Sequence, residues 1–237
     1  MNSPFVLLGF GPNGWGASLV AGAAMTLAVS AAAYIVGLAL GGLAAWARIA
    51  GPPPARRAVG LYTTVFRGIP ELLVIYLVYF GGSEALTALG HLFGGSGFIG
   101  LDGFLAGTLA VGLVAGAYQT EALRGGFLAI PRGEIEAARA VGMNRLLLLR
   151  RVIAPRALRF ALPGMGNVWQ QVLKESALIS VTGLSELMRA VNVASDSTRL
   201  PFDFGIAGFF LYLVLTSLSG GVFRTTERSL ARHERAS

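Results

Sequence analysis

The chain has 237 residues, of which 54% are hydrophobic and only 13% are charged, whereas an average soluble domain has about 25% charged residues. The formal net charge of +7 is compatible with a nucleic-acid partner, but the arginines cluster between apolar stretches, so membrane topology explains the charge better. The absence of cysteine excludes a disulfide framework and a thiolate metal site, and two distant histidines, His91 and His233, predict no metal site either.

Five apolar stretches approach the length of about 20 residues that a helix needs to cross a bilayer. The first contains no charged residue, and no lysine or arginine precedes it, so a cleavable signal peptide is not expected. The fourth is the weakest by hydropathy, because it contains Lys174 and Glu175 and three amide side chains. The predicted spans are residues 17–46, 59–81, 104–123, 160–182 and 204–223.

The distribution of arginines indicates that the fourth stretch crosses the membrane. If all five stretches cross, every arginine-rich connection lies on one side, as the positive-inside rule demands. These connections carry Arg48, Arg56 and Arg57, then seven arginines from Arg132 to Arg159, then Arg224, Arg228, Arg232 and Arg235 in the tail. The connection after the fourth span is balanced, since Glu186, Asp196 and Asp203 offset its arginines.

We therefore expect an all-α integral membrane protein with about five transmembrane helices, its N-terminus outside and its C-terminus inside. No internal repeat is evident, so residues 1–237 are expected to form a single transmembrane domain. A substrate path with two-fold character would require a second, similar chain.

The longest arginine-rich connection forms a predicted cytoplasmic elbow over residues 131–156. Good helix formers predict one helix from 133 to 151, and Pro155 is expected to stop it. An amphipathic helix lying on anionic lipid is one interpretation. A mid-helix glycine costs about 1 kcal/mol relative to alanine. A helix that lies on lipid gains nothing from Gly142 to offset this cost, whereas a protein partner could approach closely at a glycine. Contact with a protein partner is therefore the other interpretation.

The elbow also carries a recognisable motif. Glu136-Ala137-Ala138, followed by Gly142 and, thirteen residues later, Pro155, resembles the EAA loop of ATP-binding-cassette importer permeases. Val152 and Ala154 stand where that family has isoleucine and leucine. Three further segments resemble the polar amino acid subfamily, namely residues 62–70, 117–131 and 173–180. The sequence Pro70-Glu71-Leu72 looks most like the histidine, basic amino acid and opine branch.

The resemblance implies a permease fold of the type I importer kind in the bacterial inner membrane, and transport of polar, especially basic, amino acids or opines. It implies that Glu136, Ala137, Ala138, Gly142 and Pro155 couple the chain to an ATPase. The implied partners are two cytoplasmic ATP-binding subunits, a second homologous permease subunit, a periplasmic solute-binding protein and membrane lipid, without nucleic acid. The chain itself has no P-loop, because its only lysine, Lys174, follows Val172-Leu173, so ATP is expected to bind the partner and no cofactor is expected here.

Charged residues within or near the spans are candidates for a substrate path or gate, since each costs roughly 2.5 to 3.5 kcal/mol to insert. They are Arg67, Glu71, Glu121, Arg124, Lys174 and Glu175. Arg67 and Glu71 are four residues apart and are expected to pair on one helix face, as are Glu121 and Arg124, three apart. The adjacent Lys174 and Glu175 point about 100° apart and are expected to find partners elsewhere.

Of these residues, Glu71 is expected to help form a polar cavity for a cationic, amino-acid-like solute, although a structural ion pair with Arg67 is an equally good interpretation. An ion-coupled secondary amino-acid transporter is the main alternative function, because it also needs an intramembrane carboxylate, but it usually has inverted repeats. A membrane enzyme would need a nucleophile, a base or a metal cluster, and the sequence offers none at plausible spacing. No catalytic residue is therefore expected.

Overall fold

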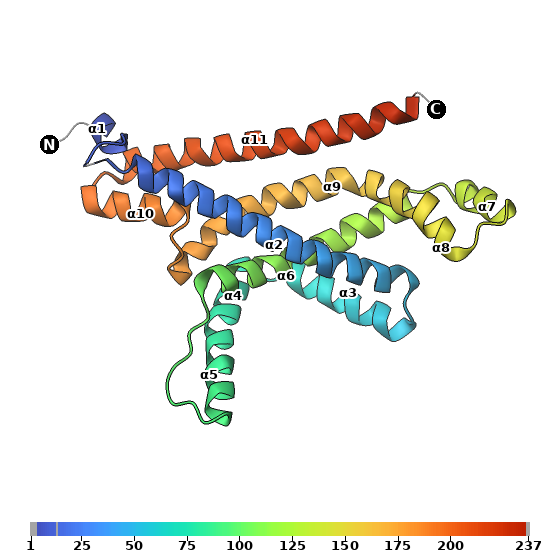
Figure 1. Ribbon diagram of the computed structural model, residues 1–237, viewed down its shortest axis with the longest axis horizontal. Coiled ribbons are helices and arrows are strands. Elements are labelled where there is room, and N and C mark those ends of the chain that lie inside the picture. Colours follow the sequence, from blue (N-terminus) through green and yellow to red (C-terminus); the bar gives the residue numbers. More distant parts are fainter. Residues whose placement is uncertain (1–3, 13, 236–237) are drawn as a thin grey trace. The chain divides into compact units, whose positions relative to one another are not determined.

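The computed structural model of the chain describes residues 4–12 and 14–235, with the side chains of residues 6–12, 14–223 and 225. It divides into two compact units. The first comprises residues up to 36, 69–112 and 171–218, and the second comprises 37–68, 113–170 and 219 onward. Four helices continue from one unit into the other, and Figure 1 labels them α2 (Gly16–Ala50), α6 (Gly103–Leu128), α9 (Ala154–Glu175) and α11 (Pro201–Arg235).

Among the described residues, every regular element is a helix, and four segments are long and apolar enough to cross a membrane. These are Gly16–Ala50, Glu71–Leu92, Gly103–Leu128 and Pro201–Phe223. A fifth span results if Arg145–Thr182 and Leu187–Thr198, which meet at a 52° bend, count as one. The all-helical class with about five spans is thus confirmed. The orientation stays a prediction, and the tail arginines on which it partly rests, Arg224, Arg228, Arg232 and Arg235, lie outside the described side chains.

The second apolar segment lies further along the chain than the expected span 59–81. Helix α3 (Pro53–Gly68) ends before Ile69, and Pro70 is the N-cap of α4 (Glu71–Tyr76). Proline disfavours helical geometry in the residue before it, so the chain breaks there. Beyond α4 the helix continues through the π-helical turn η1 (Leu77–Gly81) into α5 (Gly82–Leu92).

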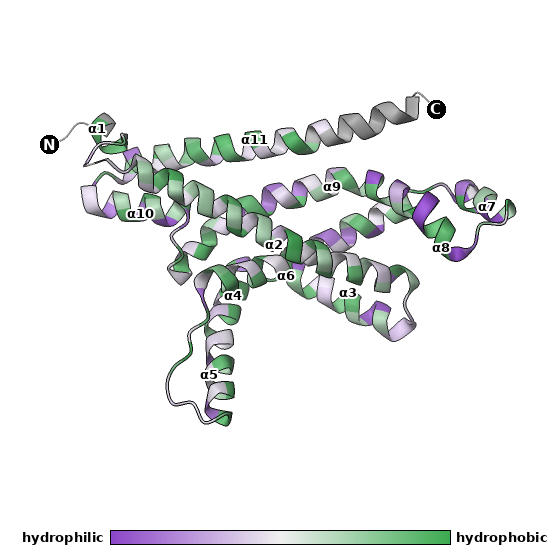
Figure 2. Ribbon diagram, in the orientation of Figure 1, coloured by the Kyte–Doolittle hydropathy of each residue, from purple (hydrophilic) through white to green (hydrophobic). Residues whose placement is uncertain are grey.

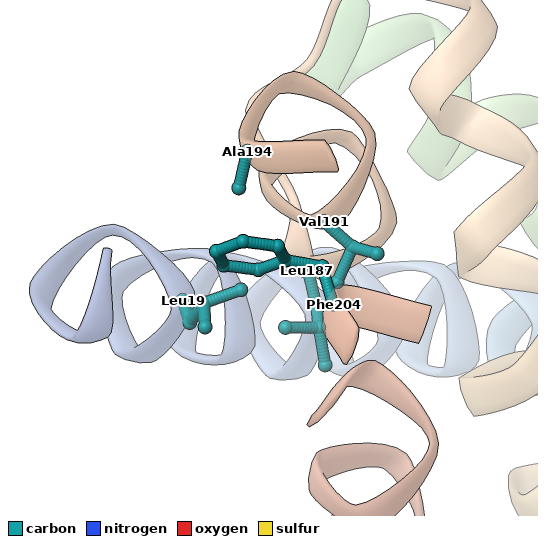
Figure 3. Packing of buried hydrophobic residues seen from close by; sticks show 5 residues of the cluster. All are labelled: Leu19, Leu187, Val191, Ala194 and Phe204. Carbon is teal, nitrogen blue, oxygen red and sulfur yellow. The ribbon is translucent and has the colours of Figure 1, made fainter. Parts of the chain in front are cut away.

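In the first unit, an apolar core joins α2, α10 (Leu187–Thr198) and α11. Figure 3 shows the side chains of Leu19, Leu187, Val191, Ala194 and Phe204 converging. The Phe204 ring also meets Trp15 edge-on, with their centroids 6.5 Å apart. Leu7 and Leu8 of the short helix α1 (Pro4–Leu8) pack against this core. Gly183, at φ 87°, lets the chain turn from the 3-10 helix η3 (Ser176–Thr182) toward α10.

In the second unit, α3 packs on α6 through Tyr62, whose hydroxyl donates to the Leu113 carbonyl at 2.6 Å. The predicted elbow consists of α7 (Arg132–Ala140), α8 (Arg145–Leu148) and the π-helical turn η2 (Leu149–Ile153), which leads into α9. Figure 2 shows hydrophilic residues gathered around α7 and α8, in contrast to the largely apolar α2.

Candidate functional site

Three polar side chains of the first unit meet where α4 begins. Glu71 is the first residue of α4, and its Oε1 atom accepts a hydrogen bond of 3.0 Å from Nε2 of Gln171 on α9. Glu175, one helical turn after Gln171, hydrogen-bonds to both Gln171 and Glu71. The structure therefore places two carboxyl groups in direct contact, with one amide between them. We call Glu71, Gln171 and Glu175 the carboxyl cluster.

The local sequence explains this arrangement. Pro70 starts α4, so Glu71 occupies the first turn, where the helix dipole favours a negative charge. Gln171 and Glu175 are four residues apart on α9 and share one face. Lys174 is exposed and close enough to act electrostatically on Glu175. All three cluster residues are partly buried. The cluster therefore holds two carboxyl groups in a partly dehydrated environment, and no basic side chain belongs to it.

The expected pair between Arg67 and Glu71 rested on a shared helix face, and that prediction was wrong. The break at residues 69–70 ends α3 just after Arg67, so the two residues belong to different helices. The Arg67 guanidinium instead lies over the Tyr118 ring of α6, with its carbon 5.2 Å from the ring centroid. This is the geometry of a cation–π contact.

The expected pair between Glu121 and Arg124 is confirmed. Both Nε and Nη2 of Arg124 approach Oε2 of Glu121 at 2.8 Å. The pair lies on α6, within the second unit, and both side chains are partly buried. It therefore neutralises one carboxylate of the second unit locally.

The elbow is not one helix, which corrects the predicted helix over 133–151. Gly142 has φ 81°, a conformation that L-residues other than glycine rarely adopt. Its N–H donates to the Arg139 carbonyl at 2.9 Å, while the Met143 N–H donates to the Ala138 carbonyl at 3.2 Å. These two bonds form a Schellman motif that ends α7. Gly142 is thus required by the backbone turn, and the argument that only a protein partner explains it no longer holds.

A second helix then starts immediately. The Asn144 side chain accepts a hydrogen bond of 2.9 Å from the Leu147 N–H and caps α8. Ala138 and Leu148 are buried, whereas Glu136, Ala137 and Gly142 are exposed. Arg156 of α9 holds α7 through an ion pair of 3.0 Å with Glu134. The motif residues Glu136, Ala137 and Gly142 are therefore displayed on the surface of this chain, on a turn with fixed geometry.

Pro155 does not stop the helix before it, contrary to expectation. Helix α8 continues through η2 into α9, and Pro155 is the second residue of α9. A proline in a regular helix removes one hydrogen bond and clashes with the carbonyl four residues earlier. The wider π turn directly before it is the kind of irregularity that accommodates such a residue.

Glu186 is the residue that sequence reasoning missed. Its charge was assigned to the connection after the fourth predicted span, but its side chain is fully buried. It is the N-cap of α10, and its Oε2 and Oε1 atoms accept from the N–H groups of Met188 at 2.8 Å and Arg189 at 2.7 Å. Oε2 also accepts from the hydroxyls of Tyr212 at 3.1 Å and Thr26 at 3.3 Å. One carboxyl group thus joins α2, α10 and α11.

The start of α10 is completely satisfied by this arrangement. A helix leaves its first four N–H groups without intrahelical partners. Here the Glu186 carboxyl group accepts from Met188 and Arg189, and the Thr26 hydroxyl oxygen accepts from the Leu187 N–H at 3.1 Å. The N–H of Glu186 itself donates to the Leu184 carbonyl at 2.9 Å. The glycine at 183 and the apolar residues after Glu186 were a signal for a helix start, but nothing in the sequence indicated burial.

Residues 37–232 match the profile of a family described as the inner membrane component of binding-protein-dependent transport systems. The chain is 55% identical over 221 residues to the octopine transport system permease protein OccQ of Rhizobium radiobacter, covering 93% of both chains. It is 37% identical over 219 residues to the histidine/lysine/arginine/ornithine transport system permease protein HisQ of Escherichia coli (strain K12), covering 91% of this chain and 94% of that one.

A solved structure also resembles the fold. The crystal structure of an amino acid ABC transporter with histidines superposes with a TM-score of 0.78 at 30% sequence identity, over 91% of this chain and 95% of that one. The similarity extends over nearly the full length of both chains.

Proposed function

Because this chain belongs to the family of inner membrane components of binding-protein-dependent transport systems, we propose that it couples the closure of a cytoplasmic ATPase to the movement of basic amino acids or opines. Its membership makes it a permease component of an importer in the bacterial inner membrane, a transport protein and not an enzyme. The coupling to an ATPase and the identity of the transported solute are what we propose beyond this membership.

The observation that carries the coupling role is the surface of the elbow. Glu136, Ala137 and Gly142 are exposed on a turn whose backbone is held by the Schellman motif and the Asn144 cap. Small side chains allow another backbone to approach closely, and Glu136 supplies a charged contact at the rim. Ala138 is buried and supports the exposed residues from inside the elbow, whereas Pro155 is exposed at the start of α9. A rigid turn of this kind transmits movement of a docked partner into α9.

The partners follow from this role. Two ATP-binding subunits would dock on the elbows of two permease chains, of which this is one and a homologous chain the other. A periplasmic solute-binding protein would deliver the cargo. ATP itself would bind the partner subunits, since this sequence lacks the glycine-rich Gly-Lys-Ser/Thr turn that holds phosphates.

The carboxyl cluster supports a cationic cargo. The hydrogen bond between the carboxyl groups of Glu71 and Glu175 requires a proton between them, and a guanidinium or ammonium group beside them can take the place of that proton. The similar permeases named above transport octopine in one case and histidine, lysine, arginine and ornithine in the other. Glu71 and Glu175 would bind the cationic end of the solute, and Lys174, Arg67, Glu121 and Arg124 would line or gate its route.

The coupling role is tested at Glu136 and Gly142. We expect Glu136→Arg and Gly142→Trp to abolish uptake and to reduce co-purification of the ATP-binding subunits, while membrane insertion stays normal. Gly142→Asn is the matched control, because asparagine tolerates the left-handed conformation. Normal uptake with Gly142→Trp would count against the coupling role.

The cargo role is tested separately at Glu71. Replacing Glu71 with glutamine and measuring uptake of a basic amino acid into reconstituted vesicles should show a lower affinity. An unchanged affinity and rate would remove Glu71 from the path. An ion-coupled transporter would instead take up the solute with a proton or sodium gradient and no ATP, so omission of ATP from the same vesicles discriminates the two functions.

A further inference from the structure

The second unit contains a cavity of about 460 Å³ that is largely open to the surroundings, and Thr64, Arg67 and Gly68 of its lining are exposed. It is lined by Arg48 at the end of α2, by Thr63, Thr64, Arg67 and Gly68 of α3, and by Glu121 of α6. This lining has two guanidinium groups and one carboxylate. The carboxyl cluster belongs to the first unit and shares no residue with this cavity.

The Arg67 side chain is held in place by a ring contact, but no carboxylate of the described side chains neutralises its charge. Its guanidinium lies over the Tyr118 ring at 5.2 Å, and no ion pair involves it among the described side chains. A guanidinium has five N–H donors, so the contact with the Tyr118 ring leaves N–H groups for an acceptor in its plane. Arg67 thus presents the planar fork that matches a carboxylate.

Arg48 adds a second positive charge. Its Nη1 donates to the Arg56 carbonyl at 3.1 Å, a bond that fixes the side chain and leaves its charge in place. Within the described part of the chain, Arg48 makes no ion pair either. The exposed hydroxyl of Thr64 is a further donor on the same wall.

Glu121 supplies the opposite sign. Both contacts from Arg124 go to the Oε2 atom, so Oε1 is available as an acceptor. A cavity with guanidinium groups and a free carboxylate oxygen is complementary to a zwitterion. A lipid phosphodiester finds the same guanidinium donors but has no N–H group to donate to Oε1 of Glu121, which favours an amino acid over the headgroup of an anionic lipid.

We propose that this cavity binds the carboxylate of the transported solute through Arg67 and Arg48, with Glu121 accepting from its amino group. The inference rests on the proposed cargo, basic amino acids or opines, and adds a second binding station to the carboxyl cluster. Opines carry an additional carboxylate on the substituent of their amine nitrogen, and the second guanidinium gives this group a partner.

The test uses the purified transporter complex in nanodiscs of phosphatidylcholine and compares L-arginine with agmatine, which has the same guanidinium and amine but no carboxylate. Isothermal titration should show tighter binding of L-arginine to the wild type. Arg67→Gln should weaken L-arginine binding roughly tenfold, as expected for loss of a charge-assisted bidentate contact, and leave agmatine unchanged. Arg67→Lys keeps the charge but loses the planar fork, so it should retain only part of the preference. Arg57→Gln, at an exposed arginine of α3 outside the lining, should change neither ligand.

The proposal is overturned if Arg67→Gln weakens both ligands equally or neither. A second arm measures retention of phosphatidylglycerol by native mass spectrometry. If Arg67→Gln lowers lipid retention while the preference for L-arginine persists, the cavity holds a lipid phosphate and the cargo assignment is wrong.

Failure of the cavity and failure of the proposed cargo give different results. Glu71→Gln should weaken L-arginine and agmatine alike, because both present a guanidinium to the carboxyl cluster. If Glu71→Gln acts in this way but Arg67→Gln leaves the preference intact, only the cavity inference fails. If the wild type binds neither ligand, the proposed cargo and the cavity inference fail together.

Discussion

Two carboxyl sites of the first unit differ in the donors that surround them. Glu186 is fully buried and accepts hydrogen bonds from two amides and two hydroxyls. Glu71 and Glu175 are only partly buried, yet they have one shared amide donor and each other. A carboxylate whose acceptor positions are filled by its own chain has a structural role. A pair whose positions are not filled has capacity left for a ligand.

The same comparison explains why burial is a poor guide to function in this protein. Removing a charge from water is costly unless hydrogen bonds replace the lost hydration. The helix start at α10 supplies those bonds to Glu186, so deep burial is stable there. The carboxyl cluster lacks those hydrogen-bond donors, and its side chains stay partly exposed.

The largest expected effect comes from Glu186→Ala. The change leaves the N–H groups of Met188 and Arg189 and the Tyr212 hydroxyl without an acceptor, and each buried unsatisfied group costs about 1–3 kcal/mol. We expect a loss of about 3 kcal/mol or more in unfolding free energy, measured as a large fall in Tm of the detergent-purified complex. Glu84→Ala, on the exposed part of α5, should leave Tm unchanged. An equal Tm for Glu186→Ala and the wild type would contradict the structural assignment.

The opposite pattern is expected for the carboxyl cluster. Glu175→Gln replaces one carboxyl group by an amide that can still donate to Glu71, so Tm should stay the same or rise, while affinity for a basic amino acid should fall by about tenfold, or 1.4 kcal/mol. The double change with Glu71→Gln should cost less than the sum of the single changes, because both residues act on one cation. Titration of the purified complex measures the affinities. A lowered Tm with unaltered affinity would give this pair the structural role instead.

A smaller effect is expected for Tyr212→Phe. Only one of the donors to Glu186 is removed, and the ring volume is retained, so the expected loss is about 1 kcal/mol. Tyr79→Phe is the matched control, since its ring contact with Phe80 does not depend on the hydroxyl. Thermal unfolding of the two variants side by side decides the matter, and a loss for Tyr212→Phe as large as for Glu186→Ala would mean that the amides of α10 contribute little.

The smallest effect is expected for Glu134→Gln. Its ion pair with Arg156 is about one-third exposed on each side, at 32% and 34%. Exposed pairs contribute about 0–1 kcal/mol, and salt screens them. Tm measured at low and at high salt should differ slightly for the wild type and not for the variant. If Glu134→Gln lowers Tm at high salt as much as Tyr212→Phe does, then exposure does not explain the different contributions of Glu134 and Glu186 to stability.

Local patterns in the sequence predicted what depends on near neighbours. The Glu121–Arg124 pair is correct, because residues three apart on an uninterrupted helix always share a face. The same rule failed for Arg67 and Glu71, since Pro70 divides the helix between them. Pro70 signals a break in the helix, and such a break places Arg67 and Glu71 on different helices. For Pro155 the opposite happened, and a π turn allowed the helix to continue where a stop was expected.

Composition and the spacing of apolar stretches were sufficient to predict a helical membrane protein with about five spans, because hydrophobic length is set by the thickness of the bilayer. The motif at 136–155, together with the segments at 62–70, 117–131 and 173–180, was likewise sufficient to predict the family. The left-handed turn at Gly142 is local, since its bonds join residues 138 to 143. Two features depended on the folded chain: the contact of Glu71 with Glu175 and the burial of Glu186. They bring together residues 100 and 160 positions apart, Glu71 with Gln171 and Thr26 with Glu186. Such contacts arise from the packing of whole helices, which no local pattern specifies.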